Sequence, residues 1–500
     1  MSTHTLRHRA INGVVWKGAE TLGRQGIQFV VSVILARLLA PEQFGLIAML
    51  LIFTQIAQVF VDSGFATALI QKKNTDIKDE SSVFFLNIAV SILVYVILCL
   101  SSGVISRFYG EPVLGRILPL IAISIIIRAF GQIQRTLLRK NIDFKSQAKV
   151  GIISVVVSGA VGIYMAYAGC GVWALVYQQI TMALAETITF WCVSKWRPQM
   201  IFCWKSVTQL FGFGSKLLVS GLIDRVFVNI YGLIIGKLFA PADLGFYDRG
   251  RALPQLAMTS VNGTLMAVMF PVFSSMQDDR VRLKQAARKT LTISCFAIFP
   301  LMFGLVAVAE PLVRVLLTDK WLPCVPYLQI MCFVYVTWPI HVANLQILNA
   351  IGRSDIFLKL EIIKKINITI AILVTFKFGV LAMVWGQLAT AAISVFLNSY
   401  YSGKFIGYKT SDQLKDISAS CLLALFMAFV VCLAGLLAWP NIYVQLVCQV
   451  LLGVAVYIAG GKAMKLRALT ETVDIVKGVF NSKINALHLT KDVQSDEELK

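Results

Sequence analysis

The sequence predicts an all-α integral membrane protein that crosses the bilayer about fourteen times. Only 14% of its 500 residues are charged and 57% are hydrophobic, whereas a soluble domain carries about 25% charged residues because its surface faces water. The hydrophobic residues also form long continuous runs, such as Ile88–Leu100. A transmembrane β-barrel would instead show segments of about ten residues with alternating hydrophobicity.

A helix needs about 20 apolar residues to cross the hydrocarbon core of a bilayer. Fourteen segments of the chain approach or exceed this length, and the first and the seventh are the most polar of them. The predicted spans cover residues 14–36, 44–66, 81–105, 117–137, 150–170, 172–193, 210–236, 252–275, 290–316, 325–348, 361–377, 379–401, 417–438 and 442–461.

The positions of the Lys and Arg residues predict the orientation of these spans. Most of the 46 cations lie in the connections on one side of the predicted membrane. Because cytoplasmic loops are enriched in Lys and Arg, both termini are expected in the cytoplasm. The net charge of +20 is explained by these short connections. A nucleic-acid-binding protein would gather its cations on one folded surface, so no nucleic-acid partner is expected.

No cofactor, metal or nucleotide site is predicted. The ten cysteines form no Cys-x-x-Cys pair and lie mostly within apolar runs, which is typical of buried structural residues. Three Gly-Lys pairs occur, but none follows the glycine that a phosphate-binding P-loop requires. If the protein moves a solute uphill, the energy would therefore come from a coupling ion (sodium or a proton), from the membrane potential or from removal of the product. The acids considered for an ion site are Glu20, Asp62, Glu186 and Asp224.

An internal repeat relates the two halves of the chain. The first span ends in Ile34–Gly45 (ILARLLAPEQFG) and the seventh in Ile234–Gly245 (IIGKLFAPADLG), and five of the twelve aligned residues are identical. In both copies Ala-Pro ends one helix and a glycine permits the turn into the next. An offset of 200 residues spans six predicted helices, so both copies have the same orientation in the membrane.

Parallel repeats of this kind build transporters from two similar halves. The sequence predicts a six-helix lobe in residues 1–200, a second in residues 201–410, and a substrate cavity between them. Spans 13 and 14, within residues 411–462, lie outside the repeat and form either an accessory pair or a contact for a partner. Residues 463–500 are expected to form a cytoplasmic tail with an acidic end.

Polar residues of the first span share one face of the predicted helix. Lys17, Glu20, Arg24 and Gln28 fall within about 60° of one another at 100° per residue. Ionisable groups inside a membrane are costly and usually face a cavity or a partner. These residues are therefore candidates for lining the substrate cavity, although Glu20 and Arg24 also have the spacing of an internal ion pair.

The fourth span carries a ladder of arginines. Arg128, Gln132, Arg135 and Arg139 share one face, and guanidinium groups suit bidentate contacts with phosphate. Arg135 and Arg139 also fit the alternative of ordinary positive-inside anchors. Arg128 lies too deep in the span for that alternative, so it is the leading candidate for binding an anionic group.

The repeat suggests a gating pair in the two halves. Asp224 of the seventh span corresponds to Arg24 at the offset of 200 residues, and it shares a helix face with Lys216 and Ser220. We expect Asp224 to close against Arg24 when no anionic substrate separates them. Glu20, Asp224 and Lys216 are therefore assigned to gating or ion coupling.

Three further segments give the chain a family resemblance. They are Ser63–Lys73 (SGFATALIQKK), Met269–Asp279 (MFPVFSSMQDD) and Asp319–Cys332 (DKWLPCVPYLQIMC). With the ARLLAPEQFG motif and the two parallel halves, they resemble the polysaccharide transporter family of the multidrug/oligosaccharidyl-lipid/polysaccharide flippase superfamily. Within the family the chain looks most like the colanic acid and teichuronic acid exporters.

The resemblance implies a bacterial flippase of the cytoplasmic (inner) membrane. It would move an undecaprenyl-diphosphate-linked oligosaccharide to the outer leaflet by alternating access through an arginine-lined cavity, for capsule, exopolysaccharide or lipopolysaccharide synthesis. Besides this glycan, the implied partners are membrane lipid and a glycan polymerase. Three alternatives remain open at this point: a cation-coupled exporter of drugs or other solutes, a glycan-joining enzyme, and a non-catalytic scaffold for the polymerase.

Overall fold

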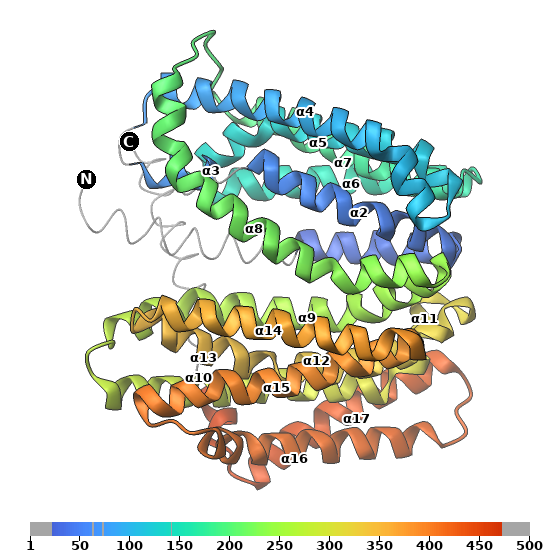
Figure 1. Cartoon of the computed structure of the whole chain (residues 1–500). Coiled ribbons are helices and arrows are strands. Elements are labelled where there is room, and N and C mark those ends of the chain that lie inside the picture. The colour runs from blue at the N-terminus through green and yellow to red at the C-terminus, as the bar shows by residue number, and fades with distance from the viewer. Residues whose placement is uncertain (1–22, 63–64, 73–74, 142, 473–500) are drawn as a thin grey trace, which may run out of the picture. The chain divides into compact units, whose positions relative to one another are not determined.

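The computed structural model describes residues 23–62, 65–72, 75–141 and 143–472. Helices make up the secondary structure of these residues, which contain no strand. Lys17 and Glu20 lie outside the described residues, as does the tail beyond residue 472. The described chain forms two compact units, labelled by helix in Figure 1.

Unit 1 contains the described residues up to Arg249, together with Leu316–Cys324 and Phe378–Val380. It begins with a helix over residues 23–38. The helices that follow are α2 (Pro41–Asp62), α3 (Phe65–Gln71), α4 (Ile77–Tyr109), α5 (Pro112–Lys140), α6 (Phe144–Tyr167), α7 (Val172–Val193), α8 (Trp204–Leu238) and the first part of α9 (Pro241–Ser275). The 3₁₀ helix η1 (Asp319–Cys324) completes it.

Unit 2 contains the remaining described residues. Its helices are the rest of α9, α10 (Arg280–Ala307), most of α11 (Ala309–Leu317), α12 (Val325–Val336), α13 (Trp338–Ala350), α14 (Ser354–Thr375), α15 (Val380–Ile406) after its first residue, α16 (Thr410–Gly435) and α17 (Ile442–Ala463), with most of the 3₁₀ helix η2 (Phe376–Phe378). Its core includes Phe273, Phe299 and Met427. Tyr457 joins α17 to α10 through a hydrogen bond from its hydroxyl to the Phe296 carbonyl at 2.9 Å.

Side-chain caps mark several helix starts near the predicted span boundaries. Asp143 accepts a hydrogen bond from the Ser146 amide at 3.0 Å at the start of α6. Asp279 caps α10 through the amides of the next turn, and Asn441 caps α17. Such caps satisfy amides that have no partner within the helix. Each of these helices begins at or before the apolar run that it contains.

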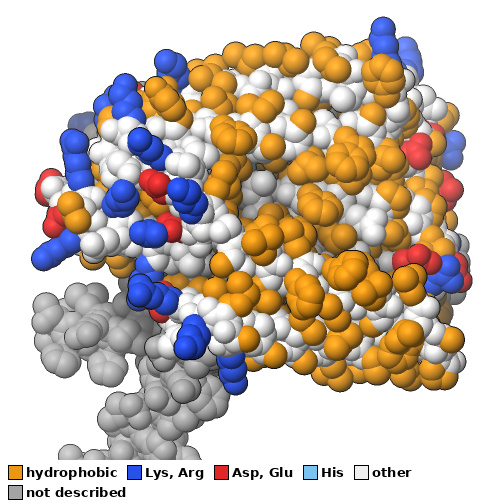
Figure 2. All heavy atoms as spheres, turned by 90° about the horizontal axis from the view of Figure 1, so that it is seen from below, with side chains coloured by type: hydrophobic (Ala, Val, Ile, Leu, Met, Phe, Trp, Pro, Cys, Tyr) orange, Lys and Arg blue, Asp and Glu red, His pale blue; other side chains and the backbone are white. Residues whose placement is uncertain are grey.

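The membrane class predicted from the composition is confirmed. Ten helices within the described residues are long and apolar enough to cross a bilayer. The predicted sixth, eighth and eleventh spans are helical in α7, α9 and α14 but are not among those ten. The first predicted span, residues 14–36, is not among them either and lies partly outside the described residues, so the number fourteen stays a prediction. Figure 2 shows hydrophobic side chains over the middle of one face, with Lys and Arg gathered at one end. The lobe boundary at residue 200 also remains a prediction.

The two copies of the repeated motif lie against each other within unit 1. A Cβ atom at Gly45 would overlap the carbonyl oxygen of Pro241, and one at Gly245 would overlap that of Pro41. The absence of a side chain at both glycines therefore lets the starts of α2 and α9 touch backbone to backbone. The repeat identified in the sequence thus forms a reciprocal junction, with each glycine on the other copy's proline.

Trp321 of η1 packs beside this junction. Its side chain is fully buried, and its indole nitrogen donates to the Ala36 carbonyl at 2.8 Å. Its ring makes edge contacts with Phe44 and Phe246 at centroid distances of 5.4 and 6.0 Å. One aromatic residue from beyond residue 300 thereby joins the first copy of the motif to Phe246, the residue that directly follows the second copy.

We expect Gly45→Ala and Gly245→Ala each to lower the free energy of unfolding by about 1–3 kcal/mol, the usual cost of an extra methyl group in a closely packed site. The measurement is the thermal unfolding midpoint of the protein in detergent. Gly103→Ala in α4 is the control, because a Cβ at Gly103 has nothing within 4 Å and alanine favours a helix. Equal midpoints for the three variants would contradict the junction.

Candidate functional site

The arginine ladder predicted in the fourth span lies on α5 and meets an acid of α7. Arg128 Nη1 lies 3.2 Å from Glu186 Oε2, and Arg135 forms an ion pair with the other oxygen of the same carboxylate. Only 12% of the Glu186 side chain is exposed, against 31% and 30% for the two arginines. One largely buried carboxylate therefore holds two guanidinium groups inside a predicted membrane span.

Gln132 connects the ladder to α2. Its Nε2 donates to Asp62 Oδ1 at 2.9 Å, and Gln58 Nε2 donates to the same oxygen at 3.2 Å. Asp62 is the last described residue of α2 before α3. Three helices of unit 1 thus supply one polar cluster, defined here as the α5 cluster: Asp62, Arg128, Gln132, Arg135 and Glu186.

Close packing of α5 on α7 sets the geometry of the α5 cluster. A Cβ at Gly131 would lie 3.2 Å from Thr187 Oγ1, so a larger side chain there would push the two helices apart. Thr187 Oγ1 donates to the Ile127 carbonyl at 2.8 Å. The Phe190 ring lies 5.5 Å from the Arg135 guanidinium carbon, within the range of a cation–π contact.

A small pocket of about 10 Å³ opens at these groups, enough for about one water. It is lined by Arg128, Gly131, Gln132, Arg135, Glu186, Thr187 and Phe190. A pocket this small does not hold a glycan in the structure described. It does give a ligand atom or a water access to both arginines and to the carboxylate that binds them.

The charges near the α5 cluster are unequal. Arg24, Arg128 and Arg139 repel Arg135, while Asp62 attracts it, and Glu186 pairs with it directly. Four guanidinium groups thus stand against two carboxylates, a surplus of two positive charges among these groups. Nε of Arg24 is buried with no hydrogen-bond partner among the described residues. In a medium of low dielectric constant, such a surplus strongly favours an anion.

The remaining predicted site residues do not all join the α5 cluster. Gln28, on the helix over 23–38, is exposed. Asp224 on α8 is exposed and has interactions of its own, and the side chain of Lys216 is outside the described part of the chain. The proposed closure of Asp224 against Arg24 therefore stays a prediction.

Two features of the interior were missed in the sequence. Glu186 was considered only as an ion site, although an acid inside an apolar span usually has a cationic partner; that rule could have paired it with the ladder. Asp62, also considered only as an ion site, is exposed and accepts hydrogen bonds from Gln132 and Gln58. Arg249 of α9 was not considered at all. Its guanidinium lies over the Phe44 ring, 4.2 Å from the centroid, and donates to Ser32 Oγ.

Among the described residues, no group of three or more His, Cys, Asp or Glu side chains could hold a metal ion. The chemistry that the α5 cluster offers is recognition of an anion by guanidinium groups. Arginine presents two parallel N–H donors to a phosphate or a carboxylate. The same donors are held by Glu186 in the structure described.

Comparison with known proteins confirms the resemblance noted in the sequence. A family model described as "Polysaccharide biosynthesis protein" matches residues 34–326. The teichuronic acid biosynthesis protein TuaB of Bacillus subtilis (strain 168) is 27% identical over 70% of this chain and 73% of its own length. The succinoglycan biosynthesis transport protein ExoT of Rhizobium meliloti (strain 1021) is 25% identical over 91% of this chain and 93% of its own length.

The fold is also found among solved structures. The lipid II flippase MurJ, in an inward closed conformation, superposes with a TM-score of 0.75 at 15% sequence identity, over 90% of this chain and 98% of its own. At this identity the match shows the fold. It agrees with the membrane helices predicted from the sequence.

A double-mutant cycle tests the ion pair at the centre of the α5 cluster. Glu186→Gln and Arg135→Gln are each expected to destabilise the protein, because the first leaves two guanidinium groups without their carboxylate and the second removes one of the two partners of Glu186. The double variant should lose less unfolding free energy than the two single variants lose together, and the difference, the coupling energy, should be about 1–3 kcal/mol. The readout is chemical unfolding in mixed detergent. Arg116→Gln, at an exposed position of the same helix, is the control, and its effect on the unfolding free energy should add to that of Glu186→Gln. If the effects of Arg135→Gln and Glu186→Gln were also additive, the ion pair would be refuted.

Proposed function

The chain belongs to the polysaccharide biosynthesis protein family, and from this we propose that it is a flippase for a lipid-linked oligosaccharide. The cargo would be an undecaprenyl-diphosphate-linked repeat unit, moved from the cytoplasmic to the outer leaflet of a bacterial inner membrane. The observation that carries this proposal is the surplus of Arg24, Arg128, Arg135 and Arg139 over the carboxylates of Asp62 and Glu186 in and around the α5 cluster. The names of the relatives, a biosynthesis protein and a transport protein for bacterial glycans, support it.

A lipid diphosphate fits the chemistry of the α5 cluster. Its phosphates carry negative charge that must leave water as the lipid crosses the membrane, and guanidinium groups can replace that hydration through charge-assisted hydrogen bonds. Arg128 and Arg135 would bind the diphosphate, with Arg24, Lys17, Gln28 and Gln132 lining its path. The surplus positive charge disfavours a cationic drug as the cargo.

Glu186 suggests how the substrate could be released. Glu186 occupies the donors of both arginines, so a diphosphate would compete with it for the same groups. The carboxylate would take the arginines back when the lipid leaves. Binding and release would then be an exchange of two anions, which keeps the guanidinium groups paired throughout.

Alternating access to one site needs no covalent step. Glu20, Asp224 and Lys216 are proposed to gate the site or to couple it to a sodium ion or a proton. Both termini would lie in the cytoplasm, as the distribution of Lys and Arg predicts. A glycan polymerase in the same membrane would receive the translocated unit.

The test of the function is the sidedness of the lipid-linked glycan. In host cells depleted of this protein, the undecaprenyl-linked unit should stay shielded from a glycan-cleaving enzyme added to spheroplasts. Wild type and Arg116→Ala should restore its exposure. Arg128→Ala should lower the rate of exposure at least about tenfold, because a hydrogen bond to a charged group contributes about 1.5–3 kcal/mol. Arg128→Lys should restore part of it.

One result would overturn the flippase proposal, and a second would overturn the role of Arg128 in it. One is unchanged sidedness on depletion in a host without a second flippase. The other is full activity of Arg128→Ala at normal membrane abundance, which would remove Arg128 from the site.

Competition by Glu186 gives a separate prediction. Glu186→Gln should bind a short-chain polyprenyl diphosphate about tenfold more tightly or better, since removing 1.4 kcal/mol of competing attraction changes an affinity by that factor. It should also release the lipid more slowly. The measurement is equilibrium binding of the labelled lipid to protein in detergent, with Glu310→Gln at an exposed acid as the control. Weaker binding by Glu186→Gln would show that Glu186 only supports the fold.

A further inference from the structure

The loop between α7 and α8 presents apolar side chains to the surroundings of unit 1. Met200 is 93% exposed, Phe202 51% and Trp204, the first residue of α8, 66%. Neighbouring Ile201 is 37% exposed. This loop, residues 194–203 with Trp204 and Lys205, is called the α7–α8 loop below. Its apolar side chains are not explained by the packing of the membrane helices.

Hydrogen bonds hold the α7–α8 loop in place. The Gln199 amide donates to Ser81 Oγ at 3.1 Å, and the Cys203 amide donates to Ser82 Oγ at 2.8 Å. Both serines are fully buried in the first turns of α4. These contacts tie the backbone on either side of Met200 to α4, so the apolar tip is held outward by a fixed scaffold.

Arg197 braces the base of the same loop. Its guanidinium donates to the carbonyls of Ser194, Trp196 and Trp191 at 2.6–3.0 Å and lies 5.3 Å from the Trp191 ring. It is therefore a structural residue of the loop. Lys195 and Lys205 are exposed and remain available to a ligand.

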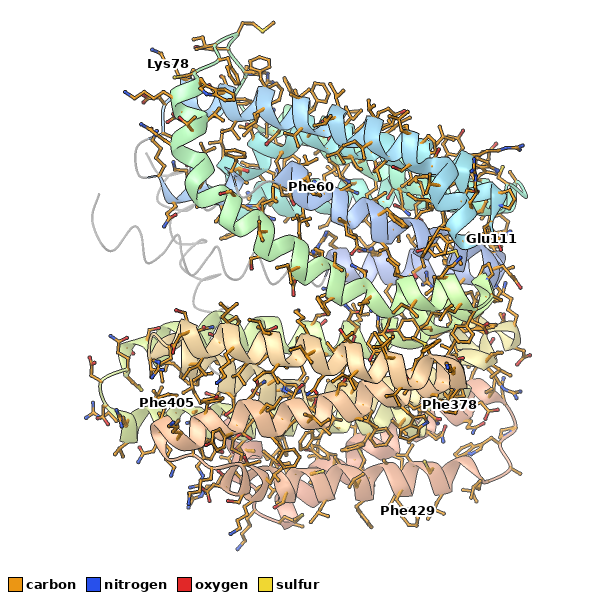
Figure 3. All side chains as sticks on the ribbon, viewed as in Figure 1. Phe60, Lys78, Glu111, Phe378, Phe405 and Phe429 are labelled. Atoms are coloured by element: carbon orange, nitrogen blue, oxygen red, sulfur yellow. The ribbon has the colours of Figure 1, made fainter. Side chains whose placement is uncertain are left out.

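The position and charge of the α7–α8 loop match a membrane interface. In Figure 1 the loop leaves the bundle across the direction of the helices, level with the N-terminal end of α4. Figure 3 places Lys78 at that end of α4 and Glu111 at the other. Residues 194–205 contain three cations and no acid. Aromatic residues and cations together are typical of the boundary between hydrocarbon and headgroups.

We propose that the α7–α8 loop is an interfacial anchor that binds anionic phospholipid. Met200, Phe202 and Trp204 insert into the headgroup region of the leaflet at that end of the helices. Lys195 and Lys205 contact lipid phosphates from either side of the apolar tip. This site is separate from the α5 cluster, and the proposal stands whether or not the chain moves a glycan.

The first experiment measures where residue 200 lies. The full chain, with its native cysteines replaced, carries Met200→Cys with a nitroxide label and is reconstituted in phosphatidylcholine vesicles with or without phosphatidylglycerol. We expect the label to be accessible to oxygen and shielded from a water-soluble nickel chelate. A label at Lys409→Cys, in an exposed loop of unit 2, should remain accessible to the chelate. A water-accessible label at residue 200 in both lipids would overturn the proposal.

The second experiment measures the charge preference. Lys195→Gln/Lys205→Gln should lower the affinity for labelled phosphatidylglycerol more than tenfold, since one lysine near an anionic surface contributes a factor of about five. Lys409→Gln/Lys415→Gln, a matched pair of exposed lysines in unit 2, should not. Unchanged affinity of the Lys195→Gln/Lys205→Gln variant for phosphatidylglycerol would overturn the proposal. So would shielding of residue 200 only after a host membrane protein is added, which would identify a protein contact. Glycan sidedness is read separately, so failure of the flippase proposal would not affect these results.

Discussion

The paired charges of Arg128, Arg135 and Glu186 are the interaction on which the interior of unit 1 depends. Leaving two guanidinium groups unpaired inside a membrane would cost several kcal/mol each. A single carboxylate on α7 makes these arginines tolerable, and it fixes how α5 and α7 face each other. Gly131 and Thr187 bring the two helices close enough for the contact. The arginines of α5 can therefore be kept only if α7 packs with Glu186 against them.

A second constraint lies at the repeated motif. Gly45 and Gly245 are needed because the backbones of the two motif copies touch, and Trp321 fills the adjacent space with hydrogen-bonded aromatic packing. Both constraints occur in the part of the chain that the family model matches, residues 34–326. The first constraint holds charged groups between α5 and α7, and the second fixes the approach of the starts of α2 and α9.

Much of the candidate site followed from spacing along one helix. Arg128, Gln132 and Arg135 share a face because a helix turns 100° per residue, and the structure turns that face toward other polar groups. Their partners were not predictable from spacing. Asp62 lies 70 residues from Gln132, which it binds, and Glu186 lies 51 residues from Arg135. Contacts across such separations depend on which helices become neighbours.

The sequence by itself determined that this is a helical membrane protein with a repeated motif, because hydropathy and helix spacing are local properties of the chain. Its resemblance to a glycan-biosynthesis family likewise followed from short segments of the sequence. Only the tertiary structure decided that the two motif copies touch, that Glu186 pairs with two arginines, and that the α7–α8 loop exposes Met200. The physical reason is that each of these depends on the approach of segments distant in the chain. Packing and charge pairing in an apolar medium select that approach, and no local pattern encodes it.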